Sequence, residues 1–128
     1  MVSQFHYLLE NELPKKYPNL RWAFIEAAAS WLPYALQDLE SRLSRKGKKL
    51  GDNPLEDNNI WITLETADDI PYLIDCVGDD NFLIGTDYGH TDTSAQIEAL
   101  RMLGKNPKIS ATSIEKILGA NPTKVYGF

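Results

Sequence analysis

The sequence predicts an α/β protein in which three parallel strands alternate with helices. Three short apolar segments, at residues 20–25, 60–64 and 81–85, have the composition of buried strands. Each is followed by residues whose apolar positions recur at helical spacing. Strands that alternate with helices form parallel sheets with right-handed crossovers, so we expect the carboxyl ends of all three strands to lie at one edge.

A helix opens the chain, because its apolar residues fall at i, i+3, i+4 and i+8, namely Phe5, Leu8, Leu9 and Leu13. The prolines at positions 14 and 18 end it. After the first strand, Ser30 is the expected N-cap of a second helix with leucines at positions 32, 36, 39 and 43 on one face. Residues 47–59 are polar and rich in Gly, Lys, Asn and Asp, which predicts a loop.

The second half repeats this order. After the strand at 60–64, Thr66 and Asp69 have capping-box spacing, and Gly78 ends the helix that follows. After the third strand we expect a helix at about residues 93–103. A last helix is expected at about 110–118, with Gly119 after it.

A sheet of three parallel strands would have two open edges and one face with too few helices to cover it. The chain also opens in a helix where a strand should have preceded. We therefore expect residues 1–128 to be the C-terminal part of a larger α/β protein.

Composition excludes several classes of protein. A net charge of -5 argues against a nucleic-acid binder, although residues 42–49 hold five basic side chains and leave an RNA-binding loop as a remote alternative. The lone Cys76 is expected to be a small buried residue of a reducing compartment. Without a membrane span or a signal peptide, the expected setting is cytoplasmic, with no membrane partner.

Polar side chains follow each predicted strand, where parallel α/β folds bind ligands. Glu26 and then Trp31 follow the first strand, Glu65 follows the second, and residues 86–92 follow the third. Asp87 is the strongest candidate, because a carboxylate at a strand end can bind a divalent metal or take a proton from a metal-bound water. In the alternative, Asp87 and Asp92 only cap the next helix, and His90 is an ordinary loop histidine.

Residues 82–92, which contain Gly-Thr-Asp-Tyr-Gly-His at 85–90, resemble the last-strand motif of the amidohydrolase superfamily. The similarity is to the branch that holds aminocarboxymuconate-semialdehyde decarboxylase and related aromatic-acid decarboxylases and hydrolases, which typically reads Gly-Ser-Asp-Tyr-Pro-His there. Residues 109–127 are similar to that family's closing helix and tail, and residues 20–33 to its sixth strand and the helix after it. The resemblance covers nearly the whole chain.

This resemblance implies the C-terminal part of a (β/α)8 TIM barrel, with about three parallel strands and their helices, so residues 1–128 would be a partial amidohydrolase-related domain. It implies that Asp87 is a catalytic residue and a metal ligand. Glu26 falls where many members place a strand-six histidine, and we expect Glu26, His90 and Trp31 to contact substrate. The implied metal is divalent, with zinc expected in the complete barrel, and this chain alone could lack it.

The chain also departs from the family. Members bind their metal through a His-x-His pair on the first strand and a histidine on the fifth, whereas this sequence has only His6 and His90. We therefore expect the parent to be a metal-dependent hydrolase or decarboxylase of a small molecule and this chain to be inactive alone. The alternative is a non-catalytic α/β module that self-associates or pairs with a partner chain, and a homo-oligomer is expected.

Overall fold

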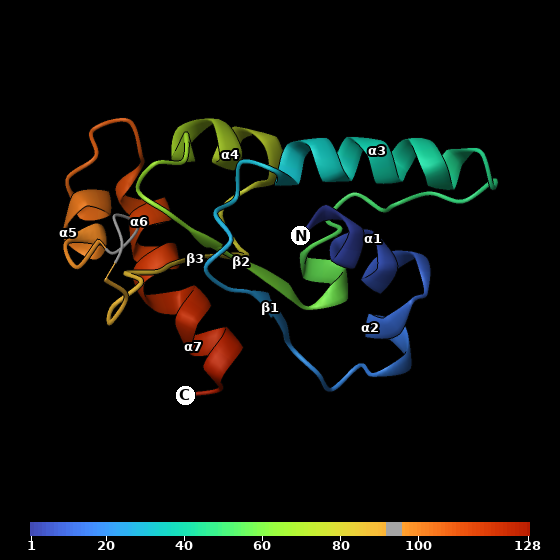
Figure 1. Cartoon of the computed structure of the whole chain (residues 1–128), viewed down its shortest axis with the longest axis horizontal. Helices are drawn as coiled ribbons and strands as arrows, with labels where there is room; N and C mark the ends of the chain where they lie inside the picture. The colour runs from blue at the N-terminus through green and yellow to red at the C-terminus, as the bar shows by residue number, and fades with distance from the viewer. Residues whose placement is uncertain (92–95) are drawn as a thin grey trace.

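The structure is a computed structural model that describes residues 1–91 and 96–128. Three short strands lie between groups of helices, with α3 and α4 along one side and α5, α6 and α7 at one end (Figure 1). The elements are α1 (Val2–Glu10), α2 (Leu13–Lys16), β1 (Trp22–Phe24), α3 (Leu32–Ser44), a 3₁₀ turn (Glu56–Asn58), β2 (Ile60–Leu64), α4 (Ile70–Val77), β3 (Phe82–Ile84), α5 (Ala99–Gly104), α6 (Ala111–Glu115), a π-helical segment (Lys116–Ala120) and α7 (Asn121–Tyr126).

The sheet has the order β1-β2-β3, and both strand pairs are parallel. Phe24 of β1 lies opposite Ile62 of β2, which in turn lies opposite Phe82 of β3. β2 is the central strand, and all five of its residues are buried. The predicted fold class, α/β with three parallel strands and flanking helices, is confirmed.

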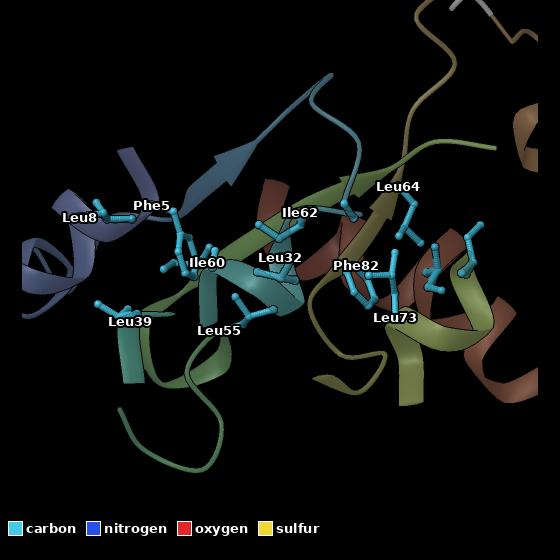
Figure 2. Packing of buried hydrophobic residues seen from close by; sticks show 14 of the residues in the cluster. Phe5, Leu8, Leu32, Leu39, Leu55, Ile60, Ile62, Leu64, Leu73 and Phe82 are labelled. Carbon is cyan, nitrogen blue, oxygen red and sulfur yellow. The ribbon is translucent and has the colours of Figure 1, made fainter. Parts of the chain in front are cut away.

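One face of the sheet packs against helices to form the hydrophobic core. Figure 2 shows Leu32 of α3 beside Ile62, and Leu73 of α4 beside Phe82 and Leu64. These five side chains are all nearly or fully buried. Each buried side chain of this size stabilises the fold by roughly 1.5–3 kcal/mol, so this face is the main source of stability.

The other face is covered unevenly. Because side chains alternate along a strand, Ala23, Trp61, Thr63 and Leu83 point to this second face. Trp61, Thr63 and Leu83 are buried, but Ala23 is exposed and Ile25 just beyond β1 is 48% exposed. The second face is therefore open at its β1 side.

Hydrogen bonds and ion pairs hold the C-terminal helices against the beginning of β3. Asn121 is fully buried, and its side-chain amide donates hydrogen bonds to the carbonyls of Asp79 (2.7 Å) and Phe82 (2.8 Å). Lys116 pairs with the carboxylates of Asp79 (2.7 Å) and Asp80 (2.9 Å). The helix predicted to end before Gly119 is thus longer than expected, because it continues through the π-helical segment to Tyr126.

Two predicted helix caps are wrong. Trp31 is the N-cap of α3, whereas the hydroxyl of Ser30 donates to the carboxylate of Asp68. Thr66 forms no capping box, because Asp69 itself is the N-cap of α4 and accepts the Tyr72 N–H. Ser30 does not cap α3 because its hydroxyl bonds to Asp68 in another loop. Thr66 does not cap α4 because Asp69, directly before the helix, takes that position.

Two further predictions differ from the structure. Cys76 is exposed, because the buried face of α4 is formed by Ile70 and Leu73. The helix expected at 93–103 is observed as α5 from Ala99 to Gly104, and positions 92–95, including Asp92, lie outside the described residues. Across the described ranges, no helix combines the length and apolar character needed to span a bilayer.

Candidate functional site

A small acidic cavity lies at the carboxyl ends of the strands. It has a volume of about 110 Å³, and its lining residues follow or end all three strands. They are Glu26, Thr63, Glu65, Thr66, Ala67, Gly85, Asp87 and Gln96. Among the described residues, the lining holds three carboxylates and no lysine or arginine, so the cavity suits a cation or a hydrogen-bond donor.

Glu26 and Asp87 line this cavity, and His90 lies beside Asp87. One candidate ligand atom from each of the three residues lies within 4.8 Å of the other two. Nδ1 of His90 is 2.9 Å from Oδ1 of Asp87, and the side chain of Asp87 is only 15% exposed. Asp87 and His90 were expected in one loop, whereas the sequence gives no sign that Glu26, sixty-one positions before Asp87, would join them.

The backbone is strained where two of these side chains emerge. Glu26 has a φ of 54° and Asp87 a φ of 50°, and Ala28 nearby has a φ of 49°. Residues with a Cβ pay roughly 1–2 kcal/mol in this left-handed region. Such conformations persist only where surrounding contacts hold them, and they cluster at functional sites.

Asp68 and Glu65 provide those contacts at the first loop. The Asp68 carboxylate accepts hydrogen bonds from the backbone N–H groups of Ala29 (3.0 Å), Ser30 (3.0 Å) and Glu65 (2.9 Å), and from the Ser30 hydroxyl (2.6 Å). Oε1 of Glu65 accepts the Ala28 N–H at 3.1 Å. The loop that carries Glu26 is therefore tied to the end of β2.

The role of Asp68 was not predicted from the sequence. One signal was available: Asp68 and Asp69 stand side by side after a strand, and a helix start needs only one capping carboxylate. The second aspartate was therefore free to make a longer-range contact.

The ends of β2 and β3 approach closely at Gly85. A Cβ on Gly85 would lie 2.8 Å from Cγ2 of Thr63. A larger residue at position 85 would therefore require the Thr63 side chain or the local backbone to move. Thr63 is 3% exposed, and within residues 1–91 and 96–128 its hydroxyl has no hydrogen-bond partner. A buried hydroxyl in the wall of a cavity is a ready ligand or donor for whatever occupies that cavity.

The remaining candidates lie elsewhere. The Trp31 ring packs against Phe5 (5.5 Å) and Phe24 (5.6 Å), and its indole N–H donates to the carbonyl of Ala28 (2.9 Å), so Trp31 does not line the cavity. Its predicted contact with substrate stays a prediction. His6 is buried against α3, where Nε2 lies 2.8 Å from the Ala35 carbonyl.

The donor set fits the divalent metal that the sequence resemblance implies. Two carboxylates and one imidazole are ligands that zinc and other first-row divalent ions accept, and three protein ligands are usual at a catalytic zinc. The buried Thr63 hydroxyl supports the same conclusion, because it faces no protein partner among the described residues.

Comparison with known proteins identifies the fold. No protein-family model matches the chain, and no curated protein matches it in sequence. An amidohydrolase from Mycobacterium avium subsp. paratuberculosis is similar in structure, with a TM-score of 0.68, 23% identity, 92% of this chain covered and 31% of that chain covered. IDCase from Metarhizium anisopliae has a TM-score of 0.51 and 23% identity over 84% of this chain and 34% of its own.

These likenesses show that the chain has the fold of part of an amidohydrolase-type barrel. The resemblance to the amidohydrolase superfamily drawn from sequence is confirmed at the level of fold. The chain spans about a third of the length of each solved structure. It is a three-stranded portion of an α/β barrel architecture, with its polar cavity at the strand ends.

Proposed function

We propose that the chain supplies the last three strands of a metal-dependent amidohydrolase-type barrel that hydrolyses or decarboxylates a small molecule. The observation that carries this proposal is the convergence of Glu26, Asp87 and His90 beside a cavity at the strand ends. In barrels of this kind the chemistry lies at that edge of the sheet. The likeness of fold to an amidohydrolase and to IDCase supports the same class of reaction.

In this proposal Asp87 holds the metal, which when bound would lower the pKa of a water or polarise the substrate. The Asp87 carboxylate is placed to accept a proton and return it. His90, whose Nδ1 lies 2.9 Å from Oδ1 of Asp87, would orient that carboxylate. The carboxylate of Glu26 lines the cavity and would bind donor groups of the substrate.

We further propose that residues 1–128 are catalytically inactive by themselves. The similar structures are about three times as long, because this chain covers only 31% and 34% of them. The family pattern places its other metal-binding histidines on those earlier strands. An open cavity also admits water, which weakens electrostatic interactions that a closed barrel would strengthen.

A chimera tests the proposal. The matching third of the Mycobacterium avium amidohydrolase would be replaced by this chain, and folding would be checked by a cooperative thermal melt. The expected chimera retains zinc and turns over aryl esters or aromatic acids, and Asp87→Asn loses both properties. Glu40→Gln, an exposed change on α3, is the matched control and should keep both. A folded chimera whose zinc content and turnover survive Asp87→Asn would contradict the proposal.

A second candidate function is a self-associating α/β module. The exposed Ala23 and the 48% exposed Ile25 leave an apolar strip beside the open edge of β1, and a second copy could pair there. This candidate predicts a homodimer by light scattering, which an Ile25→Lys change dissociates. A monomer at high concentration would count against it.

A further inference from the structure

We propose that Glu26, Asp87 and His90 form a divalent transition-metal site within this chain alone, with Glu26 as a ligand. The inference rests on the proposed function and deepens it: Glu26 changes from a substrate contact to a metal ligand, and His90 changes from a residue that orients Asp87 to a metal ligand. It shares Asp87 with that function but does not need catalysis, so binding and turnover can be tested separately.

The geometry is close to that of a three-ligand site. Zinc bonds of about 2.0–2.2 Å place tetrahedral ligand atoms roughly 3.4 Å apart. The three candidate atoms already lie within 4.8 Å of one another, so binding requires a contraction of at most about 1.4 Å. Glu26 and His90 are exposed, and their side chains can make this movement, whereas the half-buried Asp87 is held in place.

A second observation points to a ligand in the same cavity. Thr63 lines the cavity together with Glu26 and Asp87, is 3% exposed, and has a hydroxyl without a hydrogen-bond partner in the described part of the chain. Its methyl group lies toward Gly85, where the approach is tight. A metal ion, or a water bound to it, would give the hydroxyl the partner that buried polar groups nearly always have.

The charge of the cavity selects a cation. Glu26, Glu65 and Asp87 contribute carboxylates, and neither lysine nor arginine lines the cavity in the part of the chain that the structure describes. Glu65 is already used, because its Oε1 accepts the Ala28 N–H and holds the loop. Glu26 and Asp87 are the two carboxylates grouped with His90, and the negative field of the cavity repels anions.

The donor types select the kind of metal. Magnesium, calcium and manganese prefer oxygen ligands, whereas imidazole suits zinc, copper, iron and nickel. Affinity at such a site rises from Mn²⁺ to Zn²⁺. We therefore expect Zn²⁺ to bind more tightly than Mn²⁺, and Mg²⁺ not to compete with either.

Calorimetric titration with ZnCl₂ tests the inference on the 128-residue chain. The expected result is one Zn²⁺ per chain, with affinity reduced at least about tenfold in each of Glu26→Gln, Asp87→Asn and His90→Gln. The control variant Glu40→Gln should bind as the unmodified chain does. MnCl₂ should broaden the amide NMR signals of Glu26 and residues 85–90, and leave those of the last turn of α3 sharp.

Three outcomes would overturn the inference. They are the absence of one-to-one binding, an equal loss in the Glu40→Gln control, and a loss confined to Asp87→Asn while Glu26→Gln and His90→Gln bind normally. The last outcome would leave the proposed function intact, because Asp87 could still serve a complete barrel. If Asp87→Asn fails to fold, the two exposed ligands Glu26 and His90 decide the question by themselves.

Discussion

Replacing Asp68 by alanine should destabilise the folded chain by about 2–4 kcal/mol. The carboxylate accepts bonds from the N–H groups of Ala29, Ser30 and Glu65 and from the Ser30 hydroxyl, at 2.6–3.0 Å. A hydrogen bond to a charged group contributes about 1.5–3 kcal/mol when buried. Because the bonds are partly exposed and not additive, the four together are worth less than their sum.

Asp69 is the matched control, because it is the next residue and also an aspartate. Its carboxylate accepts one longer bond, from the Tyr72 N–H at 3.3 Å, and Asp69→Ala should cost about 1 kcal/mol, the usual value of an N-cap. Both changes remove one negative charge, so the difference between them measures the contacts of Asp68.

Urea unfolding followed by circular dichroism would measure both variants. With a slope of about 2 kcal/mol/M, a loss of about 2–4 kcal/mol moves the midpoint for Asp68→Ala by roughly 1–2 M. Amide NMR signals of the loop around Glu26 should shift in Asp68→Ala and stay in place in Asp69→Ala. Equal destabilisation by the two changes would refute the view that Asp68 holds this loop.

Three other predictions follow from the same structure. Burial raises the pKa of Asp79, but hydrogen bonds from Lys116 and Ser113 outweigh burial, so the pKa of Asp79 is lowered overall. The hydrogen bond to Asp79 in turn raises the pKa of Lys116. The pair should therefore stabilise the fold between the unfolded pKa values of about 4 and about 10, and lose its effect as pH falls through the lowered Asp79 pKa or rises through the raised Lys116 pKa. Lys116→Met should cost about 1 kcal/mol in urea at pH 7 and almost nothing at pH 2, since the lysine is partly exposed; the same loss at both pH values would contradict an ionic origin. Asn121→Leu should cost about 2–4 kcal/mol, because the buried Phe82 carbonyl and the partly buried Asp79 carbonyl lose their donor; an unchanged melting temperature would show that other contacts hold the C-terminal helix in place. Gly85→Ala should cost about 1–3 kcal/mol through its clash with the Thr63 methyl, and Thr63→Ser, which deletes that methyl, should recover most of the loss; additive effects in the double variant would refute the contact.

Local patterns in the sequence were enough to predict the strands and most helices. The runs at 60–64 and 81–85 are apolar because parallel strands are buried, and β2 begins and ends where this pattern does. Gly78 ends α4 as predicted. Asp87 and His90 could be paired because they are three residues apart.

Long-range contacts decided what local patterns could not. Glu26 reaches Asp87 only because β1 and β3 flank β2 in a parallel sheet and the backbone turns at a positive φ after β1. Ser30 appeared free to cap α3, yet Asp68 from another loop is its partner. Gly119 ordinarily ends a helix, but Asn121 and Lys116 hold the following turn against β3, so the helix continues.

X-ray absorption at the zinc edge, recorded on the zinc-loaded chain and on His90→Gln, tests most directly whether this chain builds a metal centre. If Glu26, Asp87 and His90 bind zinc, we expect one imidazole nitrogen and oxygen ligands at about 2.0–2.2 Å in the unmodified chain, and no imidazole signal in the variant. A coordination sphere of oxygen alone, the same in both proteins, would contradict it.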